Sequence, residues 1–497
     1  MVTTSLVLTY KQQVGLENPL PKTLPTKTMP PKLAQPCRSP VNPPPPAKLV
    51  RPELPHYLDQ FATQIVEKRE KLREHLGEKP LKPLEIELGK IFLDNWVELG
   101  GELCKPRLTM GDHPEVVAVD GSRATLDFSG NTLYLVRALA LAGKKRRRKL
   151  EADMVLSKAE TSEIDIFINQ KMEKLEFDVA REMLVEENLG DCFLLLDCSL
   201  HGRMLHIPRD TPVFGERKML LDYFESYTKL LEECKRRNVT MVGVSKDSRV
   251  EYLRKHLLAE LCRKRAGSLG GEVDRVVETL HTIGDTTKTL RKLLEEKSFG
   301  DMLLDVVAEA LAYRTDQHII RSFAETAGYT TRLELGTPSK HDETLKKLVE
   351  NPEKYLEEML PEAILETDEK EGFMEKALAT LKKIPRMPTT VFFHFLPDVK
   401  DTPLRIDVPS WVFGFEHVIG ELQGFRPVDV DVTPIVEILV DGYAGLKNYN
   451  IWLVKADQEV RIAEKIVNTL YYSTLQKIVG PTPLRTRRSR RVKHRYP

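Results

Sequence analysis

Two apolar segments of this 497-residue chain each end in an aspartate, and this pattern is the first indication of chemistry. The run Val116–Val119 leads into Asp120-Gly121-Ser122, and about eighty residues later the run "CFLLL" leads into Asp197. Continuous apolar runs of this length are typical of strands that are buried on both faces. Because open α/β sheets bind ligands at the carboxyl ends of their strands, both carboxylates are predicted at one such edge if the strands are neighbours.

A third carboxylate lies on the helix predicted between these two strands. Glu176 is four residues from Met172 and three from Val179, so it is expected on or beside the buried face of that helix. Glu173 and Asp178 lie further from this face and are weaker candidates.

Three carboxylates in one place repel one another, and at least one takes up a proton unless a cation neutralises the cluster. An all-oxygen cluster suits hard divalent ions such as Mn²⁺ and Mg²⁺. Two such ions about 4 Å apart can activate a water and stabilise the leaving oxygen in phosphodiester hydrolysis. Lys246, at the end of "VGVSK", would then orient a phosphate or stabilise the developing charge. We therefore predict that the catalytic residues are Asp120, Glu176, Asp197 and Lys246. The three acids among them are predicted to be metal ligands.

Each of these residues also has an ordinary structural explanation. Asp-Gly-Ser after a strand is a common turn. Glu176 is compatible with a carboxylate at a helix edge, and Lys246 with a lysine that leads into a helix. The combination in this order is more specific than any of its members.

The elements that must position these side chains alternate along the chain. We expect strands at 115–120, 131–141 and 152–157, with a turn at "DFSGN" and a basic turn at "KKRRRK" (144–149). A strongly amphipathic helix over 162–189 follows, then a strand at 192–200, a helix at 223–237 and a strand at 239–246. This β-β-β-α-β-α-β order predicts an α/β protein with a ribonuclease H-like mixed sheet flanked by helices.

The remaining segments extend this core into one large domain over 56–478. We expect helices at 56–76, 84–99 and 455–476, strands at 389–396 and 404–412, and a largely helical insertion over about 250–381. Residues 1–55 are predicted to be a disordered, proline-rich basic arm, and residues 479–497 a basic C-terminal tail.

Composition sets the broad class. Hydrophobic residues make up 41% and charged residues 30% of the chain, as in globular proteins, and the net charge of +1 does not itself indicate a nucleic-acid partner. The six cysteines form no CxxC pair, no apolar run approaches the roughly 20 residues of a membrane span, and the N-terminus lacks a signal-peptide core. We therefore expect reduced thiols, a cytoplasmic location and no membrane partner.

Taken in order, the motifs resemble those of the NurA nucleases of archaea and some bacteria. "VVAVDGSRA" is similar to the family's first strand ending in Asp-Gly-Ser, and "KMEKLEFDVAREML" to its helix that carries a glutamate. "FLLLDCSL" is similar to the second strand-Asp motif, with Cys198 where the family usually has glycine, and "MVGVSKDSR" to the Gly-Val-x-Lys strand. The resemblance spans roughly residues 115–478.

This resemblance implies that residues 56–478 form a NurA-like nuclease domain with a ribonuclease H-like fold, acting as a homodimer. It implies Mn²⁺-dependent DNA cleavage, as a 5′-to-3′ exonuclease and a single-strand endonuclease, with Mg²⁺ as the alternative ion. The implied partner is a HerA-type hexameric ATPase, in DNA end resection for double-strand-break repair, which implies association with the chromosome. By position, Asp120, Glu176 and Asp197 are the metal-binding acids.

One position departs from the family pattern. The segment "DGYAGLKNYNIWLVKADQEVRIA" resembles the family's last motif, in which an Ala-His pair contributes a histidine to the active site, but here Ala456 is followed by Asp457. An aspartate can ligate a hard metal, so Asp457 is a fourth candidate ligand, and its presence would change the metal preference of the site. It cannot act as a neutral imidazole ligand or as a base near pH 7.

Candidate nucleic-acid contacts lie beside the first acid and in the tail. Ser122 and Arg123 follow Asp120 directly, and the tail supplies Arg487, Arg488, Arg490 and Arg491. Phosphate contacts by such arginines would make binding strongly dependent on salt. Runs of this kind are equally typical of solvated turns and disordered tails.

Two further classes of function stay open at this point. The departure at Asp457 favours a NurA-like scaffold with impaired chemistry, which binds DNA or docks an ATPase. An actin-like ATPase or sugar kinase also begins with a strand and an aspartate, but such folds need Gly- and Thr-rich loops that cradle phosphate. "DGSRATLDFSG" has some of that character and "DCSLHGRML" has little, and the chain has no P-loop motif.

Overall fold

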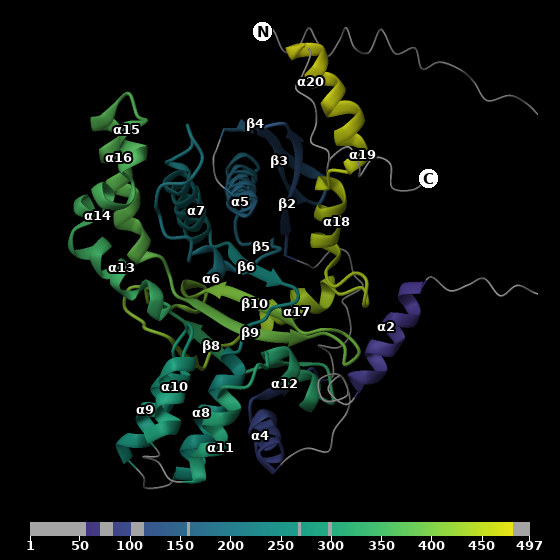
Figure 1. Cartoon of the computed structure of the whole chain (residues 1–497), viewed down its shortest axis with the longest axis vertical. Helices are drawn as coiled ribbons and strands as arrows, with labels where there is room; N and C mark the ends of the chain where they lie inside the picture. The colour runs from purple at the N-terminus through teal and green to yellow at the C-terminus, as the bar shows by residue number, and fades with distance from the viewer. Residues whose placement is uncertain are drawn as a thin grey trace, which may run out of the picture. The chain divides into compact units, whose positions relative to one another are not determined.

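The strands that carry the two aspartates lie in the middle of one large mixed sheet (Figure 1). The computed structural model describes residues 56–69, 83–100, 114–156, 160–266, 270–296 and 301–480. The chain divides into two units, Met1–Lys79 and Pro80–Pro497. In the first unit the structure describes helix α2 (His56–Glu67). The predicted arm over 1–55 and the predicted tail from residue 481 onward lie outside the described residues.

Eleven strands of the second unit, counted over the described residues, form the sheet. Their order is β1-β7-β9-β10-β6-β5-β2-β3-β4, with β8 beside β9 and β11 beside β8. Strands β2, β5 and β6 run parallel to one another, and every other pairing is antiparallel. The strands are β1 (Trp96–Glu98), β2 (Val116–Phe128), β3 (Asn131–Ala142), β4 (Lys145–Val155), β5 (Phe193–Leu196), β6 (Thr240–Ser245), β7 (Gly328–Thr330), β8 (Arg332–Leu335), β9 (Thr390–Leu396), β10 (Leu404–Pro409) and β11 (Phe425–Val428).

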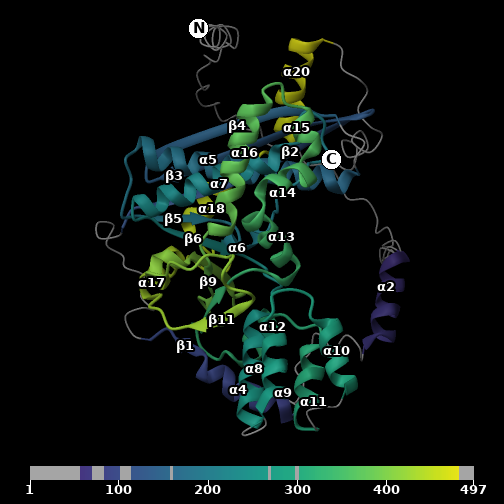
Figure 2. The ribbon, with the colours of Figure 1, turned by 90° about the vertical axis from the view of Figure 1, so that its left-hand side faces the viewer.

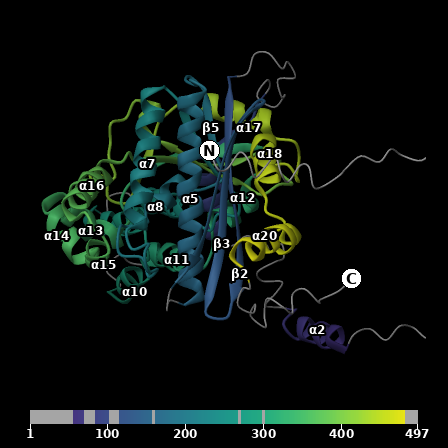
Figure 3. The ribbon, with the colours of Figure 1, turned by 90° about the horizontal axis from the view of Figure 1, so that it is seen from above.

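Helices cover both faces of this sheet. Figure 3 shows α5 (Thr161–Glu186) and α7 (Met219–Arg236) on one face, and α17 (Thr433–Gly442) and α18 (Ile451–Val460) on the other. Alternate residues of β2 follow this division, since Val117 and Val119 join the core beneath α5 and α7, whereas Val116 and Ala118 join the core beneath α17 and α18. The α/β class and the flanked mixed sheet are therefore confirmed.

Three further groups of helices complete the unit. Helix α6 (Leu200–Arg203) follows β5 directly. A second apolar core joins the helices seen together in Figure 2, which are α4 (Pro83–Asp94), α8 (Tyr252–Ala266), α9 (Gly270–Leu280), α10 (Thr287–Glu296), α11 (Asp301–Ala310) and α12 (Asp316–Phe323). The third group is α13 (Ser339–Glu350), α14 (Pro352–Met359), α15 (Pro361–Leu365), α16 (Lys370–Lys383) and the 3₁₀ turns η2 (Ile384–Arg386) and η3 (Ser410–Phe413).

The insertion predicted over about 250–381 differs from expectation in one respect. It is mostly helical, but β7 and β8 interrupt it and pair with β9 in the main sheet. Leu333 and Leu335 of β8 are fully buried, which explains why this short alternating segment joins the sheet. The predicted helix over 84–99 likewise ends at Asp94, and β1 follows it.

In the basic segment 144–149, Lys144 belongs to the turn, but residues 145–149 form a strand. The chain turns at Gly143, and β4 runs from Lys145 as the edge of the sheet. Its basic side chains pair with acids on neighbouring helices: Arg147 lies 2.8 Å from Glu186 of α5, and Arg146 lies 2.9 Å from Glu459 of α18. These pairs neutralise much of the charge that made the segment a candidate for phosphate binding.

The C-terminal helix expected over 455–476 is broken after Val460. Arg137 donates to the carbonyl oxygens of Val460 and Arg461, and so takes acceptors that a continuing helix would need. The chain then continues as α19 (Glu464–Ile466), the π-helix η4 (Val467–Tyr471) and α20 (Tyr472–Val479). No helix in the described ranges has both the length and the apolar character needed to cross a membrane.

Candidate active site

The sheet brings Asp120 and Asp197 side by side. Strands β2 and β5 pair in parallel, with Val119 opposite Leu196, and each aspartate is the next residue along its strand. Strand β2 continues beyond Asp120 to Phe128, because β3 remains paired with it along that length. Asp120 is therefore within a long strand and not at its end, but it stands where the parallel pairing with β5 stops.

Glu176, the third acid, approaches strand β2 from the face of the sheet opposite to the Asp120 side chain. By the alternation along β2, Asp120 points toward α18, whereas Gly121 points toward α5. A Cβ atom at Gly121 would contact Oε1 of Glu176 and would lie 2.7 Å from Cγ of Met172. The glycine thus leaves the space through which the Glu176 carboxylate approaches the strand. The sequence signal for this role was a glycine inside a strand, which often marks such a close approach.

Glu176 is buried, as its place on the apolar face of α5 predicted, with 4% of its surface exposed. Nη2 of Arg203, at the end of α6, donates to its Oε2 at 2.5 Å, and the guanidinium lies 5.1 Å from the Phe177 ring centre. Burial raises the pKa of Glu176 to about 7, an effect that the Arg203 charge opposes and the neighbouring Glu173 charge reinforces. Arg203 therefore holds a carboxylate that burial alone would leave protonated.

Asp197 has a cation and a phenol as partners. Nζ of Lys246, which directly follows β6, lies 2.7 Å from Oδ2 of Asp197, and the Tyr449 hydroxyl donates to the same oxygen at 2.9 Å. The Lys246 ammonium also lies 4.3 Å from the centre of the Tyr449 ring. Burial and the charge of Asp197 raise the pKa of Tyr449, so the hydroxyl stays a donor at all ordinary pH values.

Asp120 differs from the other two acids because no cationic side chain of the described segments contacts it. The backbone N–H of Gly121 donates to its Oδ1 at 2.8 Å. Burial raises its pKa to about 8, and the negative charges of Glu176, Asp197 and Asp457 act in the same direction. Excess negative charge is therefore concentrated around Asp120, and the exposed Asp457 of α18 contributes to it.

The donor chemistry of this cluster fits a divalent metal ion. Carboxylate oxygens are the ligands that hard ions prefer, and the charges of Glu176, Asp197 and Asp457, which add to the effect of burial on the pKa of Asp120, are charges that a cation would neutralise. Within the described ranges, however, no three His, Cys, Asp or Glu side chains are arranged to hold an ion. The contacts explain this, because Glu176 and Asp197 are turned toward Arg203 and Lys246. An ion held by all three acids would require those two carboxylates to exchange partners.

The other predicted residues have different surroundings. The Ser122 hydroxyl accepts a hydrogen bond from the backbone of Ile462 at 3.0 Å, and so fastens the segment after α18 to β2. Arg123 forms a partly exposed ion pair of 2.8 Å with Asp165. The tail arginines Arg487, Arg488, Arg490 and Arg491 lie outside the described residues. The residues that sequence reasoning did not select are Gly121, Arg203 and Tyr449.

The chain matches one protein family and is similar to several solved structures. The NurA domain model matches residues 114–462. The NurA nuclease from Sulfolobus solfataricus is 14% identical, with a TM-score of 0.48 over 86% of this chain and 100% of that chain. A structure of NurA with manganese is 15% identical, with a TM-score of 0.37 over 86% of this chain and 98% of that one. A structure of NurA bound to dAMP and manganese is 16% identical, with a TM-score of 0.33 over 87% and 98%. No curated protein matches the sequence.

Proposed function

The chain belongs to the NurA family, and from this premise we propose that it is a metal-dependent DNA nuclease. The observation that carries the proposal is the group of carboxylates around Asp120, a residue whose pKa is raised to about 8 first by burial and then by the charges of these neighbours. A site of this kind neutralises its charge by binding a cation, and divalent ions bound to carboxylates support phosphodiester hydrolysis.

We propose Asp120, Glu176, Asp197 and Asp457 as the residues that hold the metal. Family membership favours Mn²⁺, which is bound in a solved NurA structure, and Mg²⁺ has the same preference for oxygen ligands. When bound, the ion would supply an activated water and positive charge at the phosphate. The remaining inferences concern groups of this chain alone.

Two cations and one hydroxyl of the chain position these acids. Arg203 opposes the rise in the pKa of the buried Glu176 and fixes the direction of its carboxylate, and Tyr449 donates to one oxygen of Asp197. The Lys246 side chain is 44% exposed, so its ammonium is available to a phosphate as well as to Asp197. We propose that Lys246 binds the phosphate and stabilises charge that develops on it.

The finer properties that we propose rest on the family. They are a ribonuclease H-like fold, a homodimer, 5′-to-3′ exonuclease and single-strand endonuclease activity, and action with a HerA-type ATPase. The corresponding role is DNA end resection in double-strand-break repair, on the chromosome in the cytoplasm. The domain boundaries that we propose are an N-terminal arm over 1–55, a nuclease domain over 56–478 and a basic tail over 479–497. Contacts of Ser122, Arg123 and the tail arginines with DNA belong to the same proposal.

Cleavage of end-labelled single-stranded and 5′-tailed duplex DNA in Mn²⁺, in Mg²⁺ and in EDTA tests the function. Cutting is expected with Mn²⁺ and is expected to be lost in Asp120→Ala and in Glu176→Ala. Asp178→Ala is the matched control, because this residue of α5 forms only an ordinary pair with Lys174 along the helix. Full cleavage by Asp120→Ala would refute the assignment.

A NurA-like scaffold with impaired chemistry is the second candidate, and Asp457 is the observation that favours it. Comparison of the native protein with Asp457→His separates the two candidates. Cutting by the native protein supports the nuclease, whereas cutting by Asp457→His alone supports a scaffold whose chemistry was lost at that position.

A further inference from the structure

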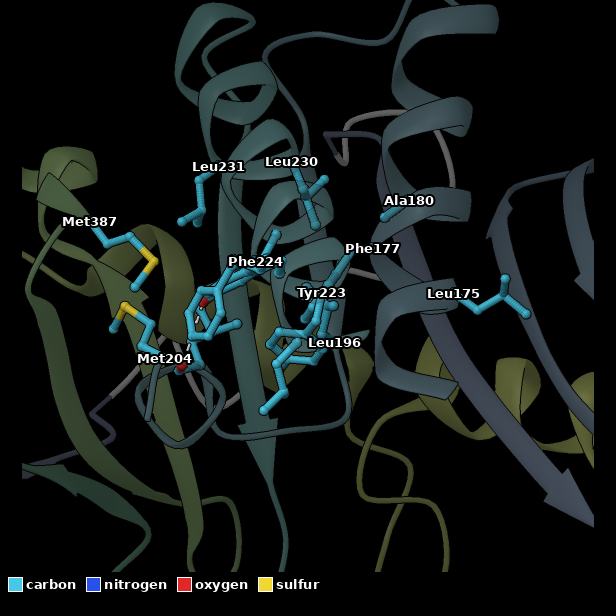
Figure 4. Packing of buried hydrophobic residues seen from close by; sticks show 14 of the residues in the cluster. Leu175, Phe177, Ala180, Leu196, Met204, Tyr223, Phe224, Leu230, Leu231 and Met387 are labelled. Carbon is cyan, nitrogen blue, oxygen red and sulfur yellow. Dashed lines mark hydrogen bonds between the residues drawn. The ribbon is translucent and has the colours of Figure 1, made fainter. Parts of the chain in front are cut away.

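A cavity of about 350 Å³ lies beside the last turns of α7, away from the carboxylates. Its apolar walls include Leu231 of α7, Met387 after η2, and the half-buried rings of Trp411 and Phe415. Figure 4 shows Leu231 and Met387 on elements that face each other. The walls thus come from three segments that are distant in sequence, and they offer apolar surface, two aromatic rings and a thioether to a ligand.

The rim of this cavity carries charges that are paired with one exception. Lys235 lies 2.8 Å from Glu416, and Lys383 lies 2.8 Å from Glu232. Arg386 is exposed and, among the described residues, has no acidic or hydrogen-bonding partner. These two lysines, two glutamates and Arg386 therefore sum to a single positive charge, located on Arg386. The histidine of the rim, His417, is paired with Glu334, whose Oε1 lies 2.8 Å from its Nδ1.

The cavity is separate from the proposed active site. Helix α7, whose last turns line the cavity, ends at Arg236, shortly before β6 begins at Thr240. Lys246, which belongs to the proposed active site, follows the opposite end of β6. A strand of six residues at about 3.3 Å per residue places roughly 20 Å between its two ends. A ligand in the cavity would therefore not contact the carboxylates.

We propose that this cavity binds a peptide segment of a partner protein, which inserts a bulky apolar side chain beside Trp411 and places a neighbouring carboxylate on Arg386. The residues that contribute most to binding in protein interfaces are enriched in tryptophan, tyrosine and arginine and lie in well-packed pockets. Arginine forms charge-assisted, bidentate hydrogen bonds with carboxylates, which fixes the direction of the segment.

Charge complementarity favours a peptide over a nucleic acid. The side chains of Glu232 and Glu416 are 59% and 79% exposed at the rim, so a phosphate backbone would meet two carboxylates at close range. One unpaired cation also matches one carboxylate better than it matches a run of phosphates. Burial of an apolar side chain supplies the larger share of the expected affinity.

Selection of a random dodecamer peptide library on the full chain tests this proposal. The expected consensus has a bulky apolar residue within a few positions of Asp or Glu. A labelled consensus peptide is then expected to bind at least tenfold more weakly to Arg386→Glu and to Trp411→Ala, by fluorescence anisotropy. Lys382→Glu is the matched control, because this exposed lysine of α16 lies next to the cavity wall without lining it.

Several outcomes would overturn the proposal. They are a library that yields no consensus, a consensus without a carboxylate, and equal binding to the native and Arg386→Glu proteins. A single-stranded oligonucleotide that displaces the peptide, and whose own binding depends on Arg386, would identify a nucleic-acid site instead. Thermal unfolding of each variant by circular dichroism distinguishes lost binding from lost structure, and Arg386→Glu changes only an exposed side chain.

Discussion

Replacement of Asp120 by asparagine is expected to stabilise the metal-free protein while it removes cleavage. Burial and the charges of Glu176, Asp197 and Asp457 raise the pKa of Asp120 from 3.8 to about 8 in the folded protein. Because the folded pKa lies above the unfolded value, the folded state binds this proton more tightly than the unfolded state does. The contribution to stability is therefore most favourable at low pH and declines as the pH rises from about 4 to about 8.

The size of the effect at pH 7 follows from these two values. At pH 7 the unfolded carboxyl, with a pKa of 3.8, is ionised, whereas the folded one still holds its proton. The difference between pH 7 and 3.8 is about three pH units, and each unit is worth about 1.4 kcal/mol. The upper limit for the gain in the free energy of unfolding is therefore about 4 kcal/mol. Asp120 is partly exposed, and solvent screens its charge, so we expect a gain of about 2 to 4 kcal/mol for Asp120→Asn. The amide keeps an oxygen that can accept from the Gly121 N–H.

Urea unfolding in EDTA at pH 7 and at pH 4 measures this gain. At pH 4 the difference between Asp120→Asn and the native protein is expected to fall below about 1 kcal/mol, because the folded carboxyl is then protonated and the unfolded one, at a pH close to its pKa of 3.8, is partly protonated as well. Asp127→Asn is the matched control, since Asp127 lies on the same strand and accepts from the Thr132 hydroxyl. Addition of Mn²⁺ is expected to stabilise the native protein more than Asp120→Asn. A variant that is less stable than the native protein at pH 7 would refute the reasoning.

Three further substitutions test the groups that support the acids. Arg203→Met leaves the buried Glu176 without its cation. It is expected to lower the free energy of unfolding by about 3 kcal/mol or more in urea and to weaken Mn²⁺ binding in calorimetry. Arg203→Lys, which keeps the charge, is expected to retain part of the stability and of the Mn²⁺ affinity. Gly121→Ala places a methyl group against the Glu176 carboxylate, so cleavage is expected to fall at least a hundredfold, whereas Gly372→Ala, where a Cβ has open space, leaves cleavage unchanged. Tyr449→Phe keeps the ring but removes one hydrogen bond to the aspartate after β5, and is expected to cost about 1 kcal/mol and to lower the cleavage rate about tenfold.

The sequence predicted the acids of this site better than the groups that hold them. Asp120 and Asp197 each follow an apolar run, and Glu176 lies on the apolar face of its helix, so local patterns alone were enough to propose these acids as candidates. Arg203 is 27 residues from Glu176, and Tyr449 is 252 residues from Asp197. Polar contacts between segments so far apart leave no periodic signal, and they became visible only in the folded chain.

Contacts between segments that are distant in sequence also explain two errors in the predicted fold. The basic run from Lys145 was interpreted as a turn because charge usually marks solvent, but its side chains are neutralised by acids on α5 and α18 along an edge strand. The helix predicted over 455–476 is broken after Val460, where Arg137, from a strand more than 300 residues earlier, donates to the carbonyl oxygens of Val460 and Arg461. In both cases a tertiary contact outweighed a local preference that the sequence displayed correctly.

The charges around the three acids give each a different part in ion binding. Glu176 and Asp197 already have a cation of the chain as a partner, whereas Asp120 has only an N–H group and negative neighbours. At the proposed metal site a divalent ion would therefore gain most at Asp120, and the other two acids would exchange one cationic partner for another. The sequence resemblance implies that Asp457 stands where the family pattern has a histidine. At the proposed metal site an aspartate would add negative charge that attracts an ion, but it would not serve as a base near pH 7.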